Sequence, residues 1–354
     1  MEVTKPQFTV PIIIFVGMLS LMGRANASSS SWDGNQQTPV LARSEDNSPP
    51  ASPSTVAAKP VNPKEGISAG KILVVLSSED KITLKNGVVH PAGFFLSELM
   101  VPLRKVLEAG YEPVFANPRG NRAIMDKISD GALWFGDTPN ATAEAKEKAG
   151  KEYRETKDLC KQLGICGEGV VGTKDLKSLA QVISEGLDQY KGVLVPGGHA
   201  PMEDLWKNKE LGQILRYFHA ARKPTALICH GPIALLSAMS DPEGYTDALS
   251  NGDAAERAKK SKDWIYKGYS ATIFTTSEEQ QEEPGQDNAL GGFVKFYPDQ
   301  ALESAGARVS RGQKWTSNVV VDRELITGQN PMSDVAFGDE LVMALAKIAK
   351  DKSK

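Results

Sequence analysis

Short apolar runs alternate with amphipathic segments along the chain from about residue 70 onward. Residues 71–78, KILVVLSS, are a β-branched apolar run between Gly70 and a polar Glu-Asp pair, as expected of a strand covered on both faces. Residues 93–110, GFFLSELMVPLRKVLEAG, place apolar side chains at helical spacing and end at a glycine, and residues 111–118, YEPVFANP, predict a second strand. A strand, a helix and a strand within about 45 residues indicate a βαβ unit and therefore a parallel sheet.

The same alternation continues toward the C-terminus. It predicts a single α/β domain over residues 70–354, with a doubly wound, mostly parallel sheet and helices on both faces. Two polar segments interrupt the pattern: residues 121–170, expected to form an inserted helical cap, and residues 241–266, a charged insertion. The remaining predicted strands are GVLVPGG, TALI, YSATIFT, ARVS, SNVVV and ELITG, and the remaining predicted helices lie near residues 176–187, 201–221, from 231 onward and at about 333–350.

The first 27 residues have the pattern of a secretory signal peptide. An apolar run, FTVPIIIFVGMLSLM, precedes Ala25-Asn26-Ala27, a small-x-small cleavage site. A retained anchor or a short membrane helix is the alternative, but Pro11, Gly17 and the shortness of the run disfavour a stable span of about 20 residues. We therefore expect export, to the periplasm if the source is a Gram-negative bacterium, with no stable membrane span after processing.

Composition adds little to this interpretation except at residues 28–69. That segment is rich in Ser, Pro, Asn and Ala without a hydrophobic period, so it is expected to be a disordered linker. The whole chain has a net charge of −3, 40% hydrophobic and 24% charged residues. These are the proportions of an ordinary soluble protein, and the absence of a long basic run gives no indication of nucleic-acid binding.

The three cysteines fall into a pair and a single residue. Cys160 and Cys166 are six residues apart in the expected cap, where they could form a disulfide in an exported protein or remain two free thiols. Neither alternative predicts a metal site, because no histidine or further cysteine lies nearby at ligand spacing. Cys229 is the remaining thiol.

Cys229 and His230 stand at a joint between a predicted strand and a predicted helix, in TALICHGPIALLSA. A small buried apolar role is the simplest interpretation of such a cysteine. However, open α/β sheets bind ligands at the carboxyl ends of their strands, and a helix start lowers the pKa of a thiol. His230 adds a ring for proton transfer and a backbone N–H that could stabilise an oxyanion.

A second predicted strand ends in Gly197-Gly198-His199, within VLVPGGHAPMEDL. Glycines allow close approach of the backbone to a bound group. If the two strands are neighbours, the N–H groups of Gly198 and His230 would both reach one oxyanion. His199 would either contribute to this site or lie on a surface loop.

These motifs, together with GFFLSELMVPL upstream and LITGQNPMSD downstream, resemble the ThiJ/PfpI superfamily within the class I glutamine amidotransferase-like fold. The similarity covers roughly residues 70–350 and is nearest to the branch of glutathione-independent glyoxalases and heat-shock holding chaperones. By this resemblance Cys229 is the nucleophile, His230 its adjacent histidine and Glu98 the glutamate that contacts the sulfur. A carboxyl group beside a thiolate is expected to be pushed toward its protonated form.

The resemblance also implies an acid five residues after the phenylalanine of a GYS strand, which gives Glu279. Three other glutamates, at positions 278, 282 and 283, are close enough in sequence to compete for this role. Some bacterial members carry a His/Glu metal site, but residue 95, where one such histidine is expected, is Phe95 here. We therefore predict no metal.

The implied reaction is conversion of methylglyoxal, a small-molecule 2-oxoaldehyde, into D-lactate through a Cys229 hemithioacetal, without an organic cofactor. Alternatives on the same triad are a cysteine amidohydrolase or peptidase and a protein deglycase. A different class of function is a stress-related holding chaperone or a redox sensor that uses Cys229 as an oxidisable thiol. Family members commonly form homodimers, so a homodimer is a further expectation.

Overall fold

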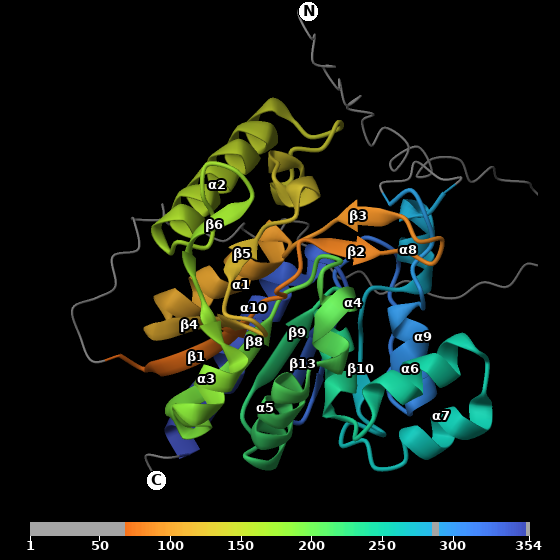
Figure 1. Cartoon of the computed structure of the whole chain (residues 1–354). Coiled ribbons are helices and arrows are strands. Elements are labelled where there is room, and N and C mark those ends of the chain that lie inside the picture. The colour runs from red at the N-terminus through yellow and green to blue at the C-terminus, as the bar shows by residue number, and fades with distance from the viewer. Residues whose placement is uncertain (1–67, 285–289, 352–354) are drawn as a thin grey trace, which may run out of the picture. The chain divides into compact units, whose positions relative to one another are not determined.

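A seven-stranded sheet lies at the centre of the part of the chain that the computed structural model describes, residues 68–284 and 290–351 (Figure 1). The strand order is β12-β13-β9-β8-β1-β4-β7, and every neighbouring pair is parallel except β12 and β13. The predicted fold class, a doubly wound and mostly parallel α/β sheet, is confirmed. The strands are β1 (Gly70–Val75), β4 (Tyr111–Asn117), β7 (Lys177–Ser178), β8 (Tyr190–Val195), β9 (Thr225–Ile228), β12 (Val319–Asp322) and β13 (Leu325–Gly328).

Both faces of the sheet are covered by helices. Along β1 the side chains alternate between two apolar clusters, with Ile72 and Val74 on one face and Leu73 and Val75 on the other. Apolar residues of α1 (Leu96–Glu108) and α10 (Asp334–Asp351) complete the first cluster, and those of α3 (Leu179–Ser184) and α5 (Lys209–Ala220) complete the second. This two-sided burial explains why β1 is a continuous apolar run.

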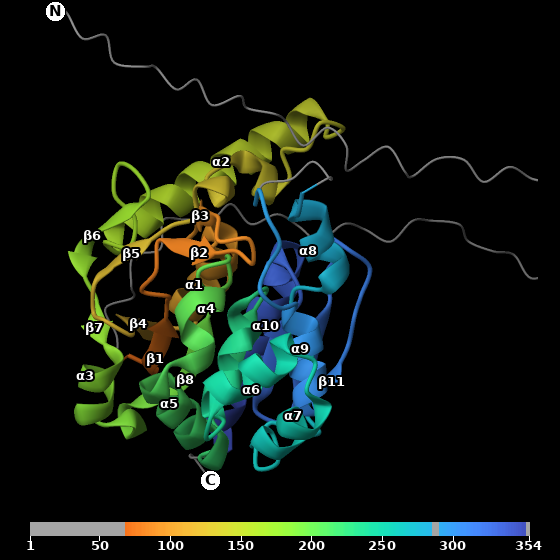
Figure 2. The ribbon, with the colours of Figure 1, turned by 45° about the vertical axis from the view of Figure 1, so that its right-hand side comes forward.

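The cap predicted at 121–170 is mainly helical but is closed by a strand pair. Its long helix is α2 (Ala143–Gln162), and β5 (Arg122–Ile124) pairs antiparallel with β6 (Val171–Asp175) at its base. Figure 2 shows α2 lying across the end of the domain that carries β2 and β3. Cys160 and Cys166 form a disulfide within this cap, so of the two alternatives the disulfide is the one observed.

Several predicted elements differ from those observed. The segment YSATIFT contributes only β10 (Ser270–Ala271), which pairs with β11 (Arg308–Val309) in a separate two-stranded sheet rather than joining the central one. The helix predicted over 201–221 is divided into α4 (Pro201–Asp204) and α5, because the Asn208 side chain accepts the Leu211 N–H and begins a new helix. The helix predicted from Gly231 is an eight-residue 3₁₀ helix, η6, in which every residue is buried.

The remaining elements surround the carboxyl ends of the strands or form the second insertion. None of the helices in the two described ranges is long and apolar enough to cross a membrane. The predicted signal peptide, residues 1–27, and residues 28–67 of the predicted linker lie outside the described residues. The other elements are β2 (Lys81–Thr83), β3 (Val89–Pro91), α6 (Pro242–Ser250), α7 (Ala254–Lys260), α8 (Thr276–Glu282) and α9 (Pro298–Ala305).

Candidate active site

Cys229 lies directly after β9, on a sharp backbone turn. Its φ of 59° is in the left-handed region, which is uncommon for a residue with a side chain. Two backbone hydrogen bonds hold this conformation: the Cys229 N–H donates to the Gly328 carbonyl at 2.9 Å, and the Cys229 carbonyl accepts the Phe274 N–H at 2.9 Å. The strained turn directs the thiol away from the strand at the carboxyl edge of the sheet, where such folds bind ligands.

The glycine pair after β8 is required because the two turns approach each other closely. A Cβ atom at Gly197 would lie 2.5 Å from Cys229 Cβ and 2.6 Å from Glu98 Oε2, and one at Gly198 would lie 2.0 Å from the Gly93 carbonyl oxygen. Gly198 also has a φ of +83°, which favours glycine. The Gly198 N–H is directed at the Cys229 sulfur, and the His230 N–H has no acceptor among residues 68–284 and 290–351. Both predicted oxyanion donors therefore lie next to Cys229, at the turn that joins β9 to η6; this turn, residues 229–230, is called the elbow below.

The structure brings the predicted triad residues into one buried hydrogen-bonded array. Cys229 Sγ is 3.3 Å from His230 Nδ1, and His230 Nε2 is 2.7 Å from Glu279 Oε1. Among the glutamates that compete in sequence, Glu279 is the one that contacts His230, whereas Glu278 accepts hydrogen bonds from Trp315, Gln329 and Asn330. Glu279 lies on α8, and four residues separate this helix from the end of β10.

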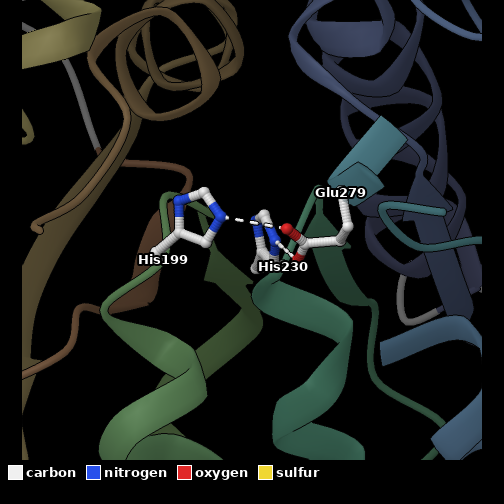
Figure 3. Close-up of side chains that lie close together, drawn as sticks. All are labelled: His199, His230 and Glu279. Carbon is white, nitrogen blue, oxygen red and sulfur yellow. Dashed lines mark hydrogen bonds and ion pairs between the residues drawn. The ribbon is translucent and has the colours of Figure 1, made fainter. Parts of the chain in front are cut away.

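His199 is a member of this array and not a surface residue. Its side chain is 10% exposed, and Nε2 lies 3.3 Å from Glu279 Oε2 and 3.6 Å from Glu282 Oε2. The alternative that placed it on a surface loop is wrong, because residues 196–200, which follow β8, are all buried. Figure 3 shows the two histidine rings next to each other, with both directed at the Glu279 carboxylate.

Glu98 and Cys229 are fully buried next to each other, and each affects the protonation of the other. Burial raises the pKa of Glu98 to about 8, while hydrogen bonds from Cys229 and the Gly197 N–H oppose the rise. Burial also raises the pKa of the Cys229 thiol, and the neighbouring Glu98 carboxyl raises it further. The helix start was expected to lower this thiol pKa, but the direction is the opposite: the segment after Cys229 is the short 3₁₀ helix η6 (Gly231–Ala238), and burial and Glu98 raise the pKa of the thiol. At neutral pH the sulfur needs a base to remove its proton.

The two histidines are driven to different protonation states. Burial alone would lower the pKa of His199, but Glu279, Glu282 and Asp126 raise it to about 9. Burial and the nearby His199 charge lower the pKa of His230. Burial would raise the pKa of Glu279, but the two histidines hold it at about 2. The array at neutral pH is thus a charged His199–Glu279 pair beside a neutral His230, whose Nδ1 lone pair faces the thiol.

A pocket of about 450 Å³ of empty space, its open mouth included, leads to Cys229. One wall is a chain of aromatic rings from four separate segments. Ring centroids are 4.8 Å apart for Phe95 and Trp134, 6.4 Å for Trp134 and Trp315, and 5.5 Å for Trp315 and Phe274. Sequence reasoning did not identify these rings as a pocket wall, nor Asp126 as a lining residue, and it considered Glu282, which also lines the pocket, only as a candidate for the triad acid.

His199, His230 and Glu279 are also the group of described residues whose ligand atoms are close enough to hold a metal ion, all within 4.8 Å of one another. However, His230 Nε2 and Glu279 Oε1 are only 2.7 Å apart and bind each other directly. Two ligands on one zinc ion at about 2.0–2.1 Å each would be further apart than this. As arranged, these residues form a hydrogen-bonded triad rather than a set of metal ligands.

Comparison with known proteins gives relatives over most of the described chain. The sequence profile of the DJ-1/PfpI family matches residues 88–243. The protein/nucleic acid deglycase HchA of Staphylococcus aureus strain MSSA476 is 25% identical over 288 residues, which are 80% of this chain and 82% of that protein.

Solved structures share the fold. Glyoxalase III of Candida albicans has a TM-score of 0.54 at 21% identity and covers 79% of this chain and 98% of its own. Rapid Encystment Protein 24 KDa of Francisella tularensis has a TM-score of 0.53 at 20% identity and covers 78% of this chain and 99% of its own. The insertions of this chain therefore leave the common α/β core recognisable.

Proposed function

This chain belongs to the DJ-1/PfpI family, and on that premise we propose that it is a cysteine-dependent lyase that converts methylglyoxal-like 2-oxoaldehydes into 2-hydroxy acids without glutathione. One observation supports this most strongly: a buried thiol, 3.3 Å from a neutral histidine, faces a small pocket with a protonated carboxyl group beside the sulfur. A thiol nucleophile, a base and a proton donor are the groups that the reaction requires.

The first step is removal of the thiol proton by His230. Its Nδ1 faces Cys229 Sγ, and Glu279 accepts a hydrogen bond from Nε2–H and stabilises the imidazolium that forms. The thiolate attacks the aldehyde carbon to give a hemithioacetal. The N–H groups of Gly198 and His230 bind the oxyanion.

The second stage is an internal redox change that needs no external electron carrier. The His230 imidazolium gives its proton to the hemithioacetal oxygen and becomes neutral again. Either this neutral His230, or Glu98 once it has donated its own proton to the C2 carbonyl oxygen, removes the proton from C1 to form an enediol. A proton is then returned to C2, so that C1 is oxidised while C2 is reduced. The product is a thioester of Cys229. Water hydrolyses this thioester to the 2-hydroxy acid and restores the thiol, as in acyl transfer by other cysteine triads.

The test is formation of lactate from methylglyoxal by the purified full-length chain, without glutathione and with detection specific for each enantiomer. We expect D-lactate from the intact chain, and a loss of about three orders of magnitude or more in Cys229→Ser. Glu98→Ala should be strongly impaired with its thiol still present by titration. No lactate from the intact chain would refute the glyoxalase proposal, and undiminished lactate from Cys229→Ser would refute the mechanism.

Protein deglycation is the second candidate, because the 25% identical relative HchA bears that activity in its name. The same thiolate can displace the amine from the hemiaminal carbon C1 of a freshly glycated lysine, with the His230 imidazolium protonating the leaving nitrogen. The C–N bond breaks as the C–S bond forms, and the resulting hemithioacetal follows the steps given above. The two candidates separate in a competition experiment with free methylglyoxal and a peptide freshly glycated on lysine. If release of unmodified peptide follows the decay of free methylglyoxal, the chain acts on the free aldehyde; if release outpaces it, the chain acts on the adduct.

We also propose that the chain is exported, with cleavage near Ala27. The N-terminal sequence pattern supports this, and so does the Cys160–Cys166 disulfide, since disulfides persist mainly in oxidising compartments.

A further inference from the structure

His199 occupies the one oxygen of Glu279 that the triad does not use. Glu279 Oε1 receives His230 at 2.7 Å, and Oε2 receives His199 at 3.3 Å, so a single carboxylate bridges two imidazoles (Figure 3). The two ring centroids are 4.3 Å apart, and all three side chains are at least nine-tenths buried. Because each oxygen of Glu279 is hydrogen-bonded to a different imidazole, the carboxylate cannot rotate without losing a charge-assisted hydrogen bond.

We propose that His199 is a positioning residue for this site: it fixes the Glu279 carboxylate by binding its second oxygen as a charged donor, and it places this charge next to the His230 ring, with the ring centroids 4.3 Å apart. This inference rests on the proposed function, in which His230 must take a proton from Cys229. His199 contacts neither the thiol nor the triad histidine through a hydrogen bond, so it acts through Glu279.

The carboxyl groups around His199 explain why His199, and not His230, is the protonated imidazole. His199 faces three carboxyl groups within the site, whereas His230 contacts Glu279 alone. The same three carboxylates raise the pKa of His199 to about 9, and the resulting cation lowers that of His230. The titratable groups that face His199 are His90 on β3, Glu98 on α1, Asp126 after β5, His230 at the elbow, and Glu279 and Glu282 on α8.

The consequence for the reaction is a base that stays available at lower pH. His230 can accept the thiol proton only in its neutral form, so activity falls where His230 becomes protonated. Removing the neighbouring cation should raise the His230 pKa and move this acidic limb to higher pH. A charge within about 4–6 Å commonly shifts a pKa by one unit or more, so we expect a shift of about one pH unit.

The first test is independent of activity. The full-length chain contains only four histidines, so their imidazole nitrogens can be resolved by NMR after ¹⁵N labelling and identified by single substitutions. With EDTA present to exclude metal effects, we expect His199 to carry both ring protons near pH 7, and His230 to be neutral with its proton on Nε2. A neutral His199 near pH 7 would overturn the proposal, whether or not methylglyoxal is the substrate.

The second test separates charge from hydrogen bonding. His199→Gln keeps a hydrogen-bond donor but removes the charge, and we expect the acidic limb of kcat/KM and the His230 titration to move together by about one pH unit upward. His219→Gln is the matched control, because His219 also binds a carboxylate, Glu324 at 2.9 Å, but at the opposite end of β9. Its pH profile should remain that of the unchanged chain. A folded His199→Gln variant with an unmoved His230 titration would refute the proposal.

A second variant covers the case in which His199→Gln does not fold. Glu282→Gln leaves both histidines in place and removes one carboxylate, 3.6 Å from His199 Nε2. We expect the His199 titration to move to lower pH by about one unit, with Glu279 still bound. An unchanged His199 titration would contradict the charge arrangement described above.

Discussion

Glu98 illustrates at the level of one residue how the fold creates a reactive group. Its sequence neighbours are apolar, and folding places its carboxyl group beside a thiol with no access to solvent. Oε1 has no hydrogen-bond partner that is seen within the described residues, and Oε2 accepts the Gly197 N–H. A carboxyl group in this position is protonated at neutral pH and can donate a hydrogen bond to sulfur.

This protonation makes stability depend on pH in a defined direction. The pKa of Glu98 is near 4.5 in the unfolded chain and about 8 in the folded one, so between these values the folded state holds a proton that the unfolded state has lost. The free energy of unfolding must then decrease as pH rises from about 4.5 to 8. Glu98→Gln does not titrate and should escape this loss.

Urea unfolding at about pH 5 and at about pH 8.5 gives the free energy of unfolding of each protein. From the lower to the higher pH, we expect the unchanged chain to lose on the order of 2–4 kcal/mol more of this free energy than Glu98→Gln loses, since one pKa unit corresponds to about 1.4 kcal/mol. Asp204 and Glu282, whose pKa values burial raises to about 7, titrate in the same window. They are present in both proteins and cancel in the difference. Parallel stability curves for the two proteins would contradict a raised Glu98 pKa.

The sequence pattern was enough to predict site residues that directly follow the end of a strand. Cys229, His230 and Gly198 belong to this class, because a strand end places them at the carboxyl edge of the sheet whatever surrounds it. The protonation state of the thiol was not predictable in the same way. It depends on burial and on Glu98, which approaches from a different part of the chain.

At the level of elements, the short helix α8 carries both carboxylates that contact His199. It begins with a capping box: Thr275 Oγ1 accepts the Glu278 N–H at 3.3 Å, and the Glu278 side chain accepts the Thr275 N–H at 3.1 Å. Glu278 also accepts hydrogen bonds from Gln329 and Asn330, which follow β13. The position of α8 therefore depends on its cap and on the end of a central strand.

Thr275→Ala should impair activity more than its effect on stability suggests. Loss of an N-cap typically costs about 0.5–2 kcal/mol, and a displaced Glu279 should lower kcat/KM by about tenfold or more. Ser178→Ala is the matched control, because Ser178 forms the same capping box with Gln181 at the start of α3, outside the site. We expect a similar loss of stability in thermal unfolding and unchanged kcat/KM in that control. Equal losses of activity in both variants would mean that the α8 cap does not position Glu279.

Element prediction succeeded where packing repeats a simple pattern and failed where the sheet ends. β1, β8 and β9 were evident because strands buried on both faces contain continuous apolar runs, such as LVV in β1 and VLV in β8. YSATIFT has the same composition but is not a strand of the main sheet: the Thr272 N–H donates to the Thr327 side chain, and the Phe274 N–H donates to the Cys229 carbonyl just beyond β9. No sequence pattern distinguishes this segment from a central strand.

At the level of the whole molecule, the pocket is assembled from segments that are far apart in sequence. Trp134 comes from the cap, Phe95 precedes α1, Phe274 precedes α8, and Trp315 lies in the segment between β11 and β12. These rings meet only because the cap and the C-terminal segment pack against the same edge of the sheet. Such placement depends on long-range packing, which explains why the aromatic wall was not predictable while the elbow was.

The cap disulfide lies close to Met125, the residue before the pocket residue Asp126. Cys166 Sγ lies 3.9 Å from the sulfur of Met125, and the Met125 N–H donates to the Val170 carbonyl, next to the residues that place Asp126 in the pocket. Constraining a loop of this size is worth about 2 kcal/mol in the chain-entropy account. The compartment in which the chain folds should therefore affect the stability of the cap.

We expect the full-length chain, produced in a Gram-negative bacterium, to be recovered outside the cytoplasm with an intact mass that begins at Ser28 and lacks the two hydrogen atoms of a dithiol. A chain that begins at Ser28 and remains in the cytoplasm should carry both thiols, because disulfides rarely persist there. It should unfold at lower temperature, by an amount equivalent to about 2 kcal/mol, and mild oxidation should restore the lost stability.

A Cys160→Ser/Cys166→Ser variant is the control, since its stability should be the same by either route. A full-length chain that keeps its first 27 residues, or that reaches the same stability with both thiols reduced, would contradict export coupled to disulfide formation.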